Sequence, residues 1–146
     1  MRVFALFICS CLFFVACGNS EKETPTPKKK KIVYDMYEPS EMAILMNKMY
    51  DYNLQLKKDV LEGKELTKFP IDFMKIHSAQ LTQEKHRDEG FESFSKLFIA
   101  AEKDIFNAES PLDIDERFNT MVNLCIACHQ TRCTGPIPRI KKLLIK

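Results

Sequence analysis

The stretch SEMAILMNKMYDYNLQLKKDVLEG, from Ser40 to Gly63, decides the fold class. Its apolar side chains recur every three or four residues, which is the spacing of one face of an α-helix. Ser40 can cap the first turn, and Gly63 can end the last turn. The segment therefore predicts a long amphipathic helix that packs against other elements. The face expected to be buried contains Met42, Leu45, Met46, Met49, Leu56 and Val60.

Two further segments towards the middle of the chain show the same periodicity. A short second helix is expected to begin near Phe69-Pro70, to bury Phe73 and Ile76, and to fade over residues 82–88. A third helix follows it and is rich in phenylalanine. The residues expected on its buried face are Phe91, Phe94, Leu97, Phe98, Ala101 and Ile105.

A fourth helix is expected to open with Ser110 as its cap and Pro111 in its first turn, and to end at Gly135-Pro136. No segment alternates with period two, so strands are not expected. Four amphipathic helices with short connections predict an all-α, antiparallel up-down-up-down four-helix bundle. The apolar seam of the fourth helix contains Ile114, Phe118, Met121, Val122, Cys125, Cys128 and His129.

The first 37 residues do not fit this pattern. Residues 1–16 combine one early basic residue with a short apolar run, which is typical of an export signal. The junction Phe14-Val15-Ala16-Cys17-Gly18 resembles a bacterial lipobox, which implies a lipid on Cys17; a plain cleaved signal peptide or an uncleaved anchor are the alternatives. Residues 17–37 are polar and basic and predict a tether before a domain at 38–146. We therefore expect an exported protein, lipid-anchored on the periplasmic side of a bacterial membrane or at the cell surface.

Charge and cysteine placement exclude two classes of protein. Lys and Arg total 22 against 20 Asp and Glu, a net charge of +2 that gives no reason to expect a nucleic-acid partner. Three of the six cysteines lie in the leader, and the other three lie between Cys125 and Cys133. A disulfide framework is therefore not expected.

The segment Cys125-Ile126-Ala127-Cys128-His129 carries the chemistry. Covalent attachment of haem c requires two thiols for the vinyl groups and a histidine that reaches the iron from the same side. On a helix, residues three and four apart share a face. The spacing therefore predicts one covalent haem c on this seam. A zinc site that adds Cys133 and a thioredoxin-like redox motif are the alternatives, and both lack the sequence context that such sites usually have.

From Pro39 to Gly135 the chain resembles the class II c-type cytochromes, the cytochrome c-prime group. The resemblance rests on the Cys125–His129 motif in the last helix and on a Met-rich first helix that ends at Gly63. Members of this family are four-helix bundles whose haem motif lies near the C-terminal end of helix four. The family commonly has a basic residue four positions after the histidine; here Cys133 stands there, and Arg132 precedes it as the candidate cofactor-binding residue.

The sixth ligand of the iron is expected to come from the first helix. In the predicted bundle the first and fourth helices run antiparallel, which places Met46 at a depth similar to that of His129. The resemblance implies a methionine at the same position, so Met46 is the first choice. Met42 and Met49 lie one turn away and can instead fill the core. His77 is a candidate for a bis-His site, but its helix is short and polar, which favours an exposed histidine; His86 is expected to be solvated.

Two functions follow from the state of that sixth position. With a ligand there, the protein is expected to be a membrane-tethered electron carrier that meets redox partner proteins. With an open position, it becomes a high-spin haem protein that binds small gases such as nitric oxide, as the resemblance also implies. No nucleophile or general base accompanies the motif, so an enzyme is not expected.

Overall fold

The computed structural model describes residues 38–66 and 68–146, which belong to a compact unit that spans residues 37–146. The expected export signal at 1–16, the lipidation site at Cys17 and the tether at 17–37 lie outside the described residues. No helix in the described part of the chain is long and apolar enough to cross a membrane.

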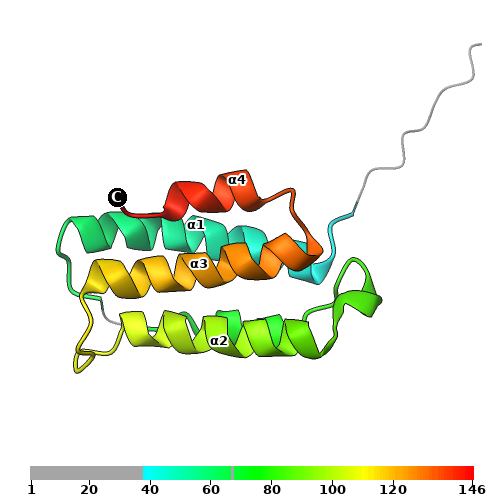
Figure 1. Ribbon diagram of the computed structural model, residues 1–146, viewed down its shortest axis with the longest axis horizontal. Coiled ribbons are helices and arrows are strands. Elements are labelled where there is room, and N and C mark those ends of the chain that lie inside the picture. The colour runs from blue at the N-terminus through cyan, green and yellow to red at the C-terminus, as the bar shows by residue number, and fades with distance from the viewer. Residues whose placement is uncertain (1–37, 67) are drawn as a thin grey trace, which may run out of the picture. The chain divides into compact units, whose positions relative to one another are not determined.

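The elements are all helical. They are α1 (Glu41–Leu61), the 3-10 helices η1 (Ile71–His77) and η2 (Glu84–His86), α2 (Glu89–Ile105), α3 (Ile114–Arg132), α4 (Ile137–Ile140) and the 3-10 helix η3 (Lys141–Leu143). No strand occurs in residues 38–66 or 68–146, so the expected all-α class is confirmed for them. Figure 1 shows that α1 and α3 run in opposite directions and that α2 and α3 lie side by side.

Helix α1 begins and ends as its sequence predicts. The Ser40 Oγ accepts a hydrogen bond from the Ala43 amide at 3.2 Å. At the other end, Gly63 has φ of +64°, a left-handed conformation that glycine adopts without the steric cost of a Cβ. The Gly63 amide donates to the Val60 carbonyl, which satisfies a group that the helix would otherwise leave open. The two terminal residues therefore set the length of α1.

The expected second helix is not an α-helix. The segment Ile71–His77 is a 3-10 helix, closed by bonds such as the Phe73 amide to the Pro70 carbonyl at 2.9 Å. It has no side-chain cap and only seven residues, and an α-helix of that length gains little from its own hydrogen bonds. Packing holds it, because the Phe73 ring meets Tyr52 edge-on at 5.3 Å and stacks with Phe98 at 6.4 Å.

The buried face of α2 differs from the expected one. Leu97 was expected to be buried, but its side chain is 53% exposed. Ser95 and Glu102 are buried instead, at 2% and 0% exposure. Residues four, seven and eleven positions after Phe91 lie on its face of a helix with 3.6 residues per turn, whereas Leu97, six positions after it, does not. Two polar residues therefore occupy core positions.

The start of α3 also corrects the prediction. Asp113, not Ser110, is the N-cap, and Pro111 precedes the helix. Ser110 is instead engaged with α2, where its hydroxyl donates to the Asp104 carboxylate at 3.2 Å. Arg117 covers the carbonyls at the end of α2, including that of Asp104 at 2.7 Å. At the other end, the helix stops at Arg132 rather than at residues 135–136.

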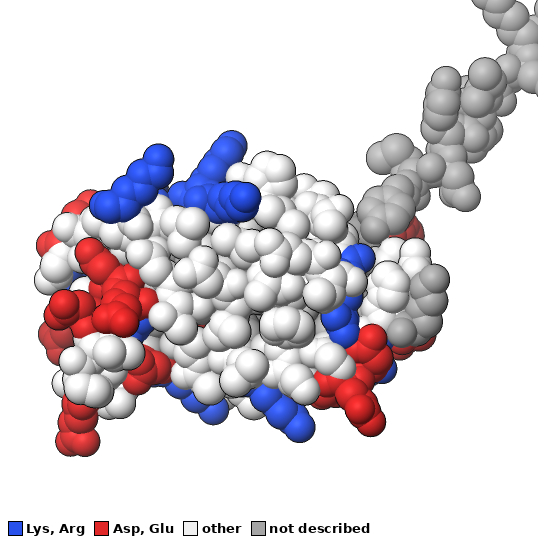
Figure 2. Space-filling view, viewed as in Figure 1, with Lys and Arg blue, Asp and Glu red and all other residues white. Residues whose placement is uncertain are grey.

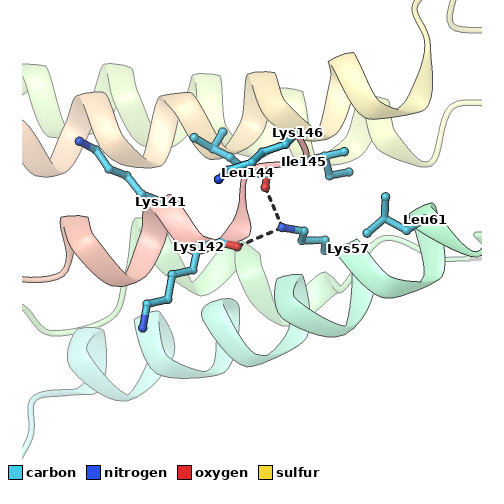
Figure 3. Close-up of a pocket in the computed structure, with 7 residues that line it drawn as sticks. All are labelled: Lys57, Leu61, Lys141, Lys142, Leu144, Ile145 and Lys146. Atoms are coloured by element: carbon cyan, nitrogen blue, oxygen red, sulfur yellow. Dashed lines mark hydrogen bonds between the residues drawn. The ribbon is translucent and has the colours of Figure 1, made fainter.

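The C-terminal segment, residues 136–146, packs on the rest of the unit. Ile140, Leu143 and Ile145 are buried. Lys57 of α1 donates to the carbonyls of residues 142 and 144 at 3.1 and 2.7 Å, in a hollow of about 500 Å³ (Figure 3). Asn119 of α3 forms two hydrogen bonds with the backbone of Ile145, at 3.0 and 2.9 Å. Figure 2 shows lysines and arginines at both the upper and the lower edge of this face, and acidic groups towards its two ends.

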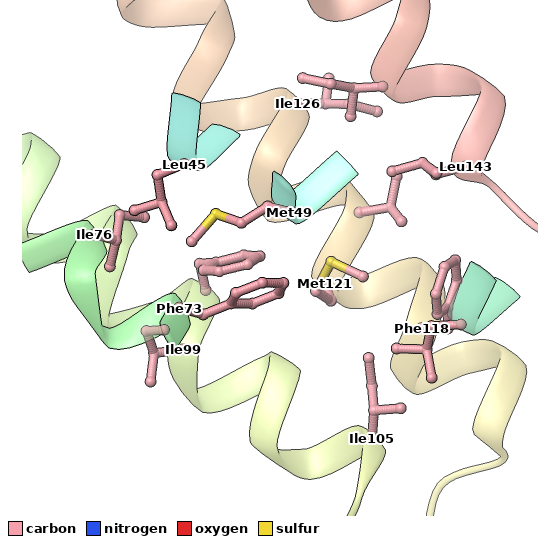
Figure 4. Packing of buried hydrophobic residues seen from close by; sticks show 14 of the residues in the cluster. Leu45, Met49, Phe73, Ile76, Ile99, Ile105, Phe118, Met121, Ile126 and Leu143 are labelled. Atoms are coloured by element: carbon pink, nitrogen blue, oxygen red, sulfur yellow. The ribbon is translucent and has the colours of Figure 1, made fainter. Parts of the chain in front are cut away.

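The core brings together α1, η1, α2, α3 and the C-terminal segment (Figure 4). Phe118, Met121 and Val122 of α3 have 0% exposure. The Met49 thioether lies beside Ile76 and the Phe73 ring in Figure 4. This packing fixes the positions of α1 and α3, which also form the walls of the site.

Candidate functional site

A cavity of about 560 Å³ lies between α1, α2, α3 and the C-terminal segment. We call it the central cavity. Its volume falls within the 300–1,000 Å³ typical of cofactor and ligand sites, and its lining is mainly apolar. Phe91, Phe94 and Phe98 of α2 form one wall, and Ile140 and Leu143 of the C-terminal segment close another part. The surface of the cavity is therefore mainly apolar, and polar side chains such as Asn53, His86 and Arg132 also line it.

All three reactive side chains of the sequence motif line the central cavity. Cys125, Cys128 and His129 are partly buried, and both cysteines are free thiols. Burial raises the pKa of both thiols, so they stay protonated near neutral pH. The Cys125 thiol lies 3.9 Å from the Met121 thioether, at the inner side of α3. The helix thus presents two thiols and an imidazole to one space, as the spacing predicts.

The His129 ring is oriented by a backbone contact. Its Nδ1 lies 2.9 Å from the Cys133 carbonyl oxygen, just past the last turn of α3. A carbonyl can only accept, so Nδ1 carries a proton, and in the neutral imidazole Nε2 therefore keeps its lone pair. Histidine ligands of metals commonly donate their second ring N–H in this way. The contact leaves the correct nitrogen available for a metal in the cavity.

Three methionines of α1 line the same cavity. Met42 and Met49 are buried at 6% and 5% exposure, whereas Met46 is partly buried at the edge of the core. The structure therefore brings Met46 into one cavity with His129. It brings Met42 and Met49 there as well, and both also pack within the core.

The structure separates the two central histidines, and only His86 departs from its expected place. His77 does not line the central cavity; its Nδ1 lies 3.3 Å from the Ser95 Oγ and 4.0 Å from the Glu92 carboxylate. His86, expected to be solvated, is partly buried and lines the cavity. The 3-10 helix η2 carries it there, and no periodic pattern in the sequence indicates such a short element.

Arg132 joins the cavity to the start of α2. Its guanidinium pairs with the Asp88 carboxylate, which also caps α2 by accepting from the Phe91 amide at 2.8 Å. That amide and then Arg132 hold the pKa of Asp88 below its usual range. Gly90 leaves room for the approach, because a Cβ there would lie 2.6 Å from the guanidinium. The Arg132 Nε is buried and has no hydrogen-bond partner among the described residues.

A buried polar pair lies at the inner side of the cavity, and the sequence analysis missed it. Asn53 lines the cavity at 2% exposure, and its Nδ2 donates to the Glu102 carboxyl at 3.5 Å. The Asn53 Oδ1 and the Glu102 Oε1 find no partner within the described chain. Burial raises the pKa of Glu102 to about 8, against the opposing bond from Asn53. Asn53 lies four residues after Met49 and continues the helical spacing of Met42, Met46 and Met49. This spacing could have predicted that Asn53 points inward.

The lining fits a haem in three respects. Two thiols share one mainly apolar cavity with an imidazole whose Nδ1 contacts a backbone carbonyl. The orphaned Arg132 Nε supplies a donor for an anionic group, such as a haem carboxylate. Thioethers on α1 supply soft ligands on the facing helix. Within the described chain, no three Cys, His, Asp or Glu side chains come together as a metal-binding group, and this includes the set of the zinc alternative.

No family model, no curated protein and no solved structure matches this chain.

Proposed function

We propose that the chain is a single-haem c-type cytochrome that acts as a membrane-tethered electron carrier. The observation that carries the proposal is that Cys125, Cys128 and His129 line one apolar cavity while the His129 Nδ1 is held by a backbone carbonyl. A bound haem c would supply reversible one-electron chemistry at iron. The redox partners would be proteins that dock near the cavity mouth.

Each lining residue would have a defined task. The Cys125 and Cys128 sulfurs would hold the group covalently, and His129 would offer its Nε2 to the iron. The phenylalanines of α2 and the C-terminal segment exclude water, which helps set the potential. Arg132 offers its unpaired Nε to a carboxylate. We also propose that the likeness to class II cytochromes extends to an up-down-up-down bundle in which η1 takes the place of the second helix; the opposite directions of α1 and α3 support this (Figure 1).

Met46 is our candidate for the sixth ligand. It lines the cavity from α1, across from α3, and it is less deeply buried than Met42 and Met49. A side chain that faces an open cavity remains partly accessible to solvent or to a ligand in that cavity. A side chain packed in the core does not. His/Met ligation raises the potential of haem iron and suits an electron carrier.

Covalent haem is the first point to test. The full chain, produced with cytochrome c maturation enzymes, should keep its haem on the denatured polypeptide in a gel. Cys125→Ala together with Cys128→Ala should release it. Cys133→Ala is the matched control, because this nearby thiol is exposed and outside the motif, and it should keep the haem. A denatured wild-type band without haem would refute the proposal.

A high-spin haem protein that binds small gases such as nitric oxide is the second candidate. The apolar lining and the volume of the cavity favour this function. A gas molecule could bind the iron beside the cofactor only if no side chain occupies the sixth position. Oxidised and reduced optical spectra separate the two functions. A low-spin spectrum that carbon monoxide leaves unchanged supports the electron carrier, and rapid carbon monoxide binding supports the gas-binding protein.

Anchoring through Cys17 is proposed from the lipobox-like junction in the sequence. Intact mass of protein from the membrane fraction should show a chain that starts at Cys17 and carries acyl groups. Cys17→Ser should release the protein from the membrane fraction. An unmodified mature chain that begins elsewhere would contradict the anchor and leave the haem proposal intact.

A further inference from the structure

Glu102 is a buried acid for which electron transfer alone gives no role. Its side chain has 0% exposure and ends among residues from two other helices. Asn53 of α1 donates to one carboxyl oxygen at 3.5 Å, and the second oxygen has no partner in residues 38–66 or 68–146. A carboxylate left in such a place loses its hydration without full compensation. Burial accordingly raises the pKa of Glu102 to about 8.

Among the residues that the structure describes, burial and the Asn53 bond set the pKa of Glu102, and no basic side chain contributes to it. Tyr52 faces it from α1 and Cys125 from α3; burial raises the pKa of both groups, and the negative charge of an ionised Glu102 raises it further. On the side of η1, Phe73 stacks with Phe98 of α2 and contributes no titratable group. The charge of Glu102 therefore depends on solvent pH and on whatever charge occupies the central cavity.

Asn53 connects this acid to the cavity. Its carboxamide is itself buried, lines the cavity, and has an Oδ1 without a partner among the described residues. One end of the amide thus bonds Glu102, while the other end remains available to a hydrogen-bond donor. Burying this polar pair costs free energy, because one oxygen of each side chain has no hydrogen-bond partner among the described residues.

We propose that Glu102 is a redox-linked proton site, coupled through Asn53 to the charge held in the central cavity. The inference rests on the proposed function, because the coupled charge is that of the haem iron. With haem bound, reduction of ferric to ferrous iron by a one-electron donor would remove one positive charge from the cavity. The Glu102 carboxylate would then take one proton from solvent and become the neutral acid. On oxidation by a partner protein, Glu102 would return this proton to water.

The sign of the coupling follows from electrostatics. A positive charge nearby favours the carboxylate, so the pKa of Glu102 is lower with ferric than with ferrous iron. Between these two values, reduction takes up a proton, and the midpoint potential falls as pH rises. For a one-electron couple linked to one proton, a tenfold drop in proton concentration lowers the potential by at most about 59 mV.

The test is a redox titration of the haem-loaded full chain between pH 5 and pH 10. The wild type should show a falling potential in a window around the pKa of Glu102. Glu102→Gln keeps the shape of the side chain and its bond to Asn53 but removes the proton, so this fall should disappear. Glu109→Gln is the matched control, since Glu109 is exposed just after α2, and it should titrate like the wild type. A flat wild-type potential, or an unchanged slope in Glu102→Gln, would overturn the proposal.

Two readouts on unmutated protein keep the inference separate from the haem proposal. Infrared difference spectra of the wild type should gain the carbonyl band of a protonated carboxylic acid on reduction. Carbon NMR of the haem-free protein should show Glu102 titrating well above an ordinary glutamate. Covalent haem with neither the band nor the slope would defeat only the proton site. A chain that never attaches haem would defeat the proposed function, even if Glu102 titrates high.

Discussion

Helices α1 and α3 face the same cavity, but their side chains are constrained in different ways. On α3, Cys125, Cys128 and His129 line the cavity, and the proposed haem attachment requires these residue types. On α1, Met42, Met46 and Met49 are alike in type and all line the cavity. Two of these three are core side chains at 5–6% exposure, and many apolar residues of similar volume would pack there.

This difference explains why a role for α3 can be predicted from its sequence, whereas a role for α1 cannot. The motif on α3 is a specific signal for haem attachment, because two cysteines and a histidine rarely occur in that order and spacing by chance. A methionine at the same spacing is compatible with packing and with iron ligation. Measurements that separate packing from ligation on α1 are therefore the most informative.

The largest effect is expected for Met46→Ala in the haem-loaded protein. If Met46 ligates the iron, its loss should convert low-spin haem to high-spin and remove the methionine-to-iron charge-transfer band of the oxidised form. The potential should fall, because the thioether favours ferrous iron. Carbon monoxide should then bind rapidly. Optical spectra and a redox titration measure all of these changes.

Met42→Ala and Met49→Ala are the matched controls for this comparison. Both side chains are buried, so each truncation should lower the free energy of unfolding by about 2–5 kcal/mol and leave the haem low-spin. If Met42 or Met49 shows the spectral change instead, the ligand lies one turn away on α1. If none of the three does, His86→Ala tests the remaining imidazole in the cavity.

The second effect concerns Glu102, which lies where α2 meets both walls. Its pKa is about 8 in the folded protein and near 4.5 when exposed in the unfolded chain. The folded state therefore holds one more proton between these values, so its stabilisation is complete below the lower pKa and is lost as pH rises to the upper one. The free energy of unfolding should fall by about 1.4 kcal/mol for each pH unit within that window. Urea titrations at several pH values measure the slope.

The control for this second effect is Glu102→Gln, which cannot ionise. Its stability should depend less on pH between about 5 and 8 than that of the wild type, by the slope of one proton. Glu109→Gln should behave as the wild type does. Equal slopes in all three proteins would mean that Glu102 is solvated in the folded state.

The helical class could be predicted from the sequence, because apolar residues recur every three or four positions over long segments. Helix α1 has the expected cap and terminal glycine. The errors lie where tertiary contacts override local preference. Aromatic packing holds residues 71–77 as a 3-10 helix. The Ser110 hydroxyl donates to Asp104 and therefore does not cap α3. Neither contact is visible in the local pattern.

The candidate site divides in the same way. The motif residues on α3 were identified by spacing alone, and the structure places them in one cavity. The inward positions of Asn53 and His86 were missed, because polar residues at core positions look like solvent-facing residues in a periodic pattern. Glu102 was missed for the same reason, since a buried acid is rare without a partner. Such positions follow from the packing of several helices together.

A third prediction concerns the C-terminal segment that closes the cavity between the two walls. Asn119→Ala removes both hydrogen bonds to Ile145 and leaves its buried backbone groups without those partners. The free energy of unfolding should fall by about 1–3 kcal/mol, and hydrogen exchange of the segment should accelerate. Asn123→Ala, at an exposed position on the same helix, is the control and should change little. Equal effects of the two substitutions would show that the segment is held by its apolar residues alone.

The smallest effect is expected for Arg132→Gln, at the end of the α3 wall. Arg132 pairs with Asp88, whose pKa is lowered first by the Phe91 amide and then by the guanidinium. Removing the guanidinium should raise the pKa of Asp88 only part of the way to its usual value, because the amide bond at 2.8 Å remains. Carbon NMR of the Asp88 carboxyl during an acid titration measures this shift. The capping bond is then lost at a higher pH than in the wild type, since a carboxylate accepts only while it is ionised. An unchanged Asp88 titration would mean that Arg132 is directed elsewhere in the folded protein, towards the cavity that its unpaired Nε borders.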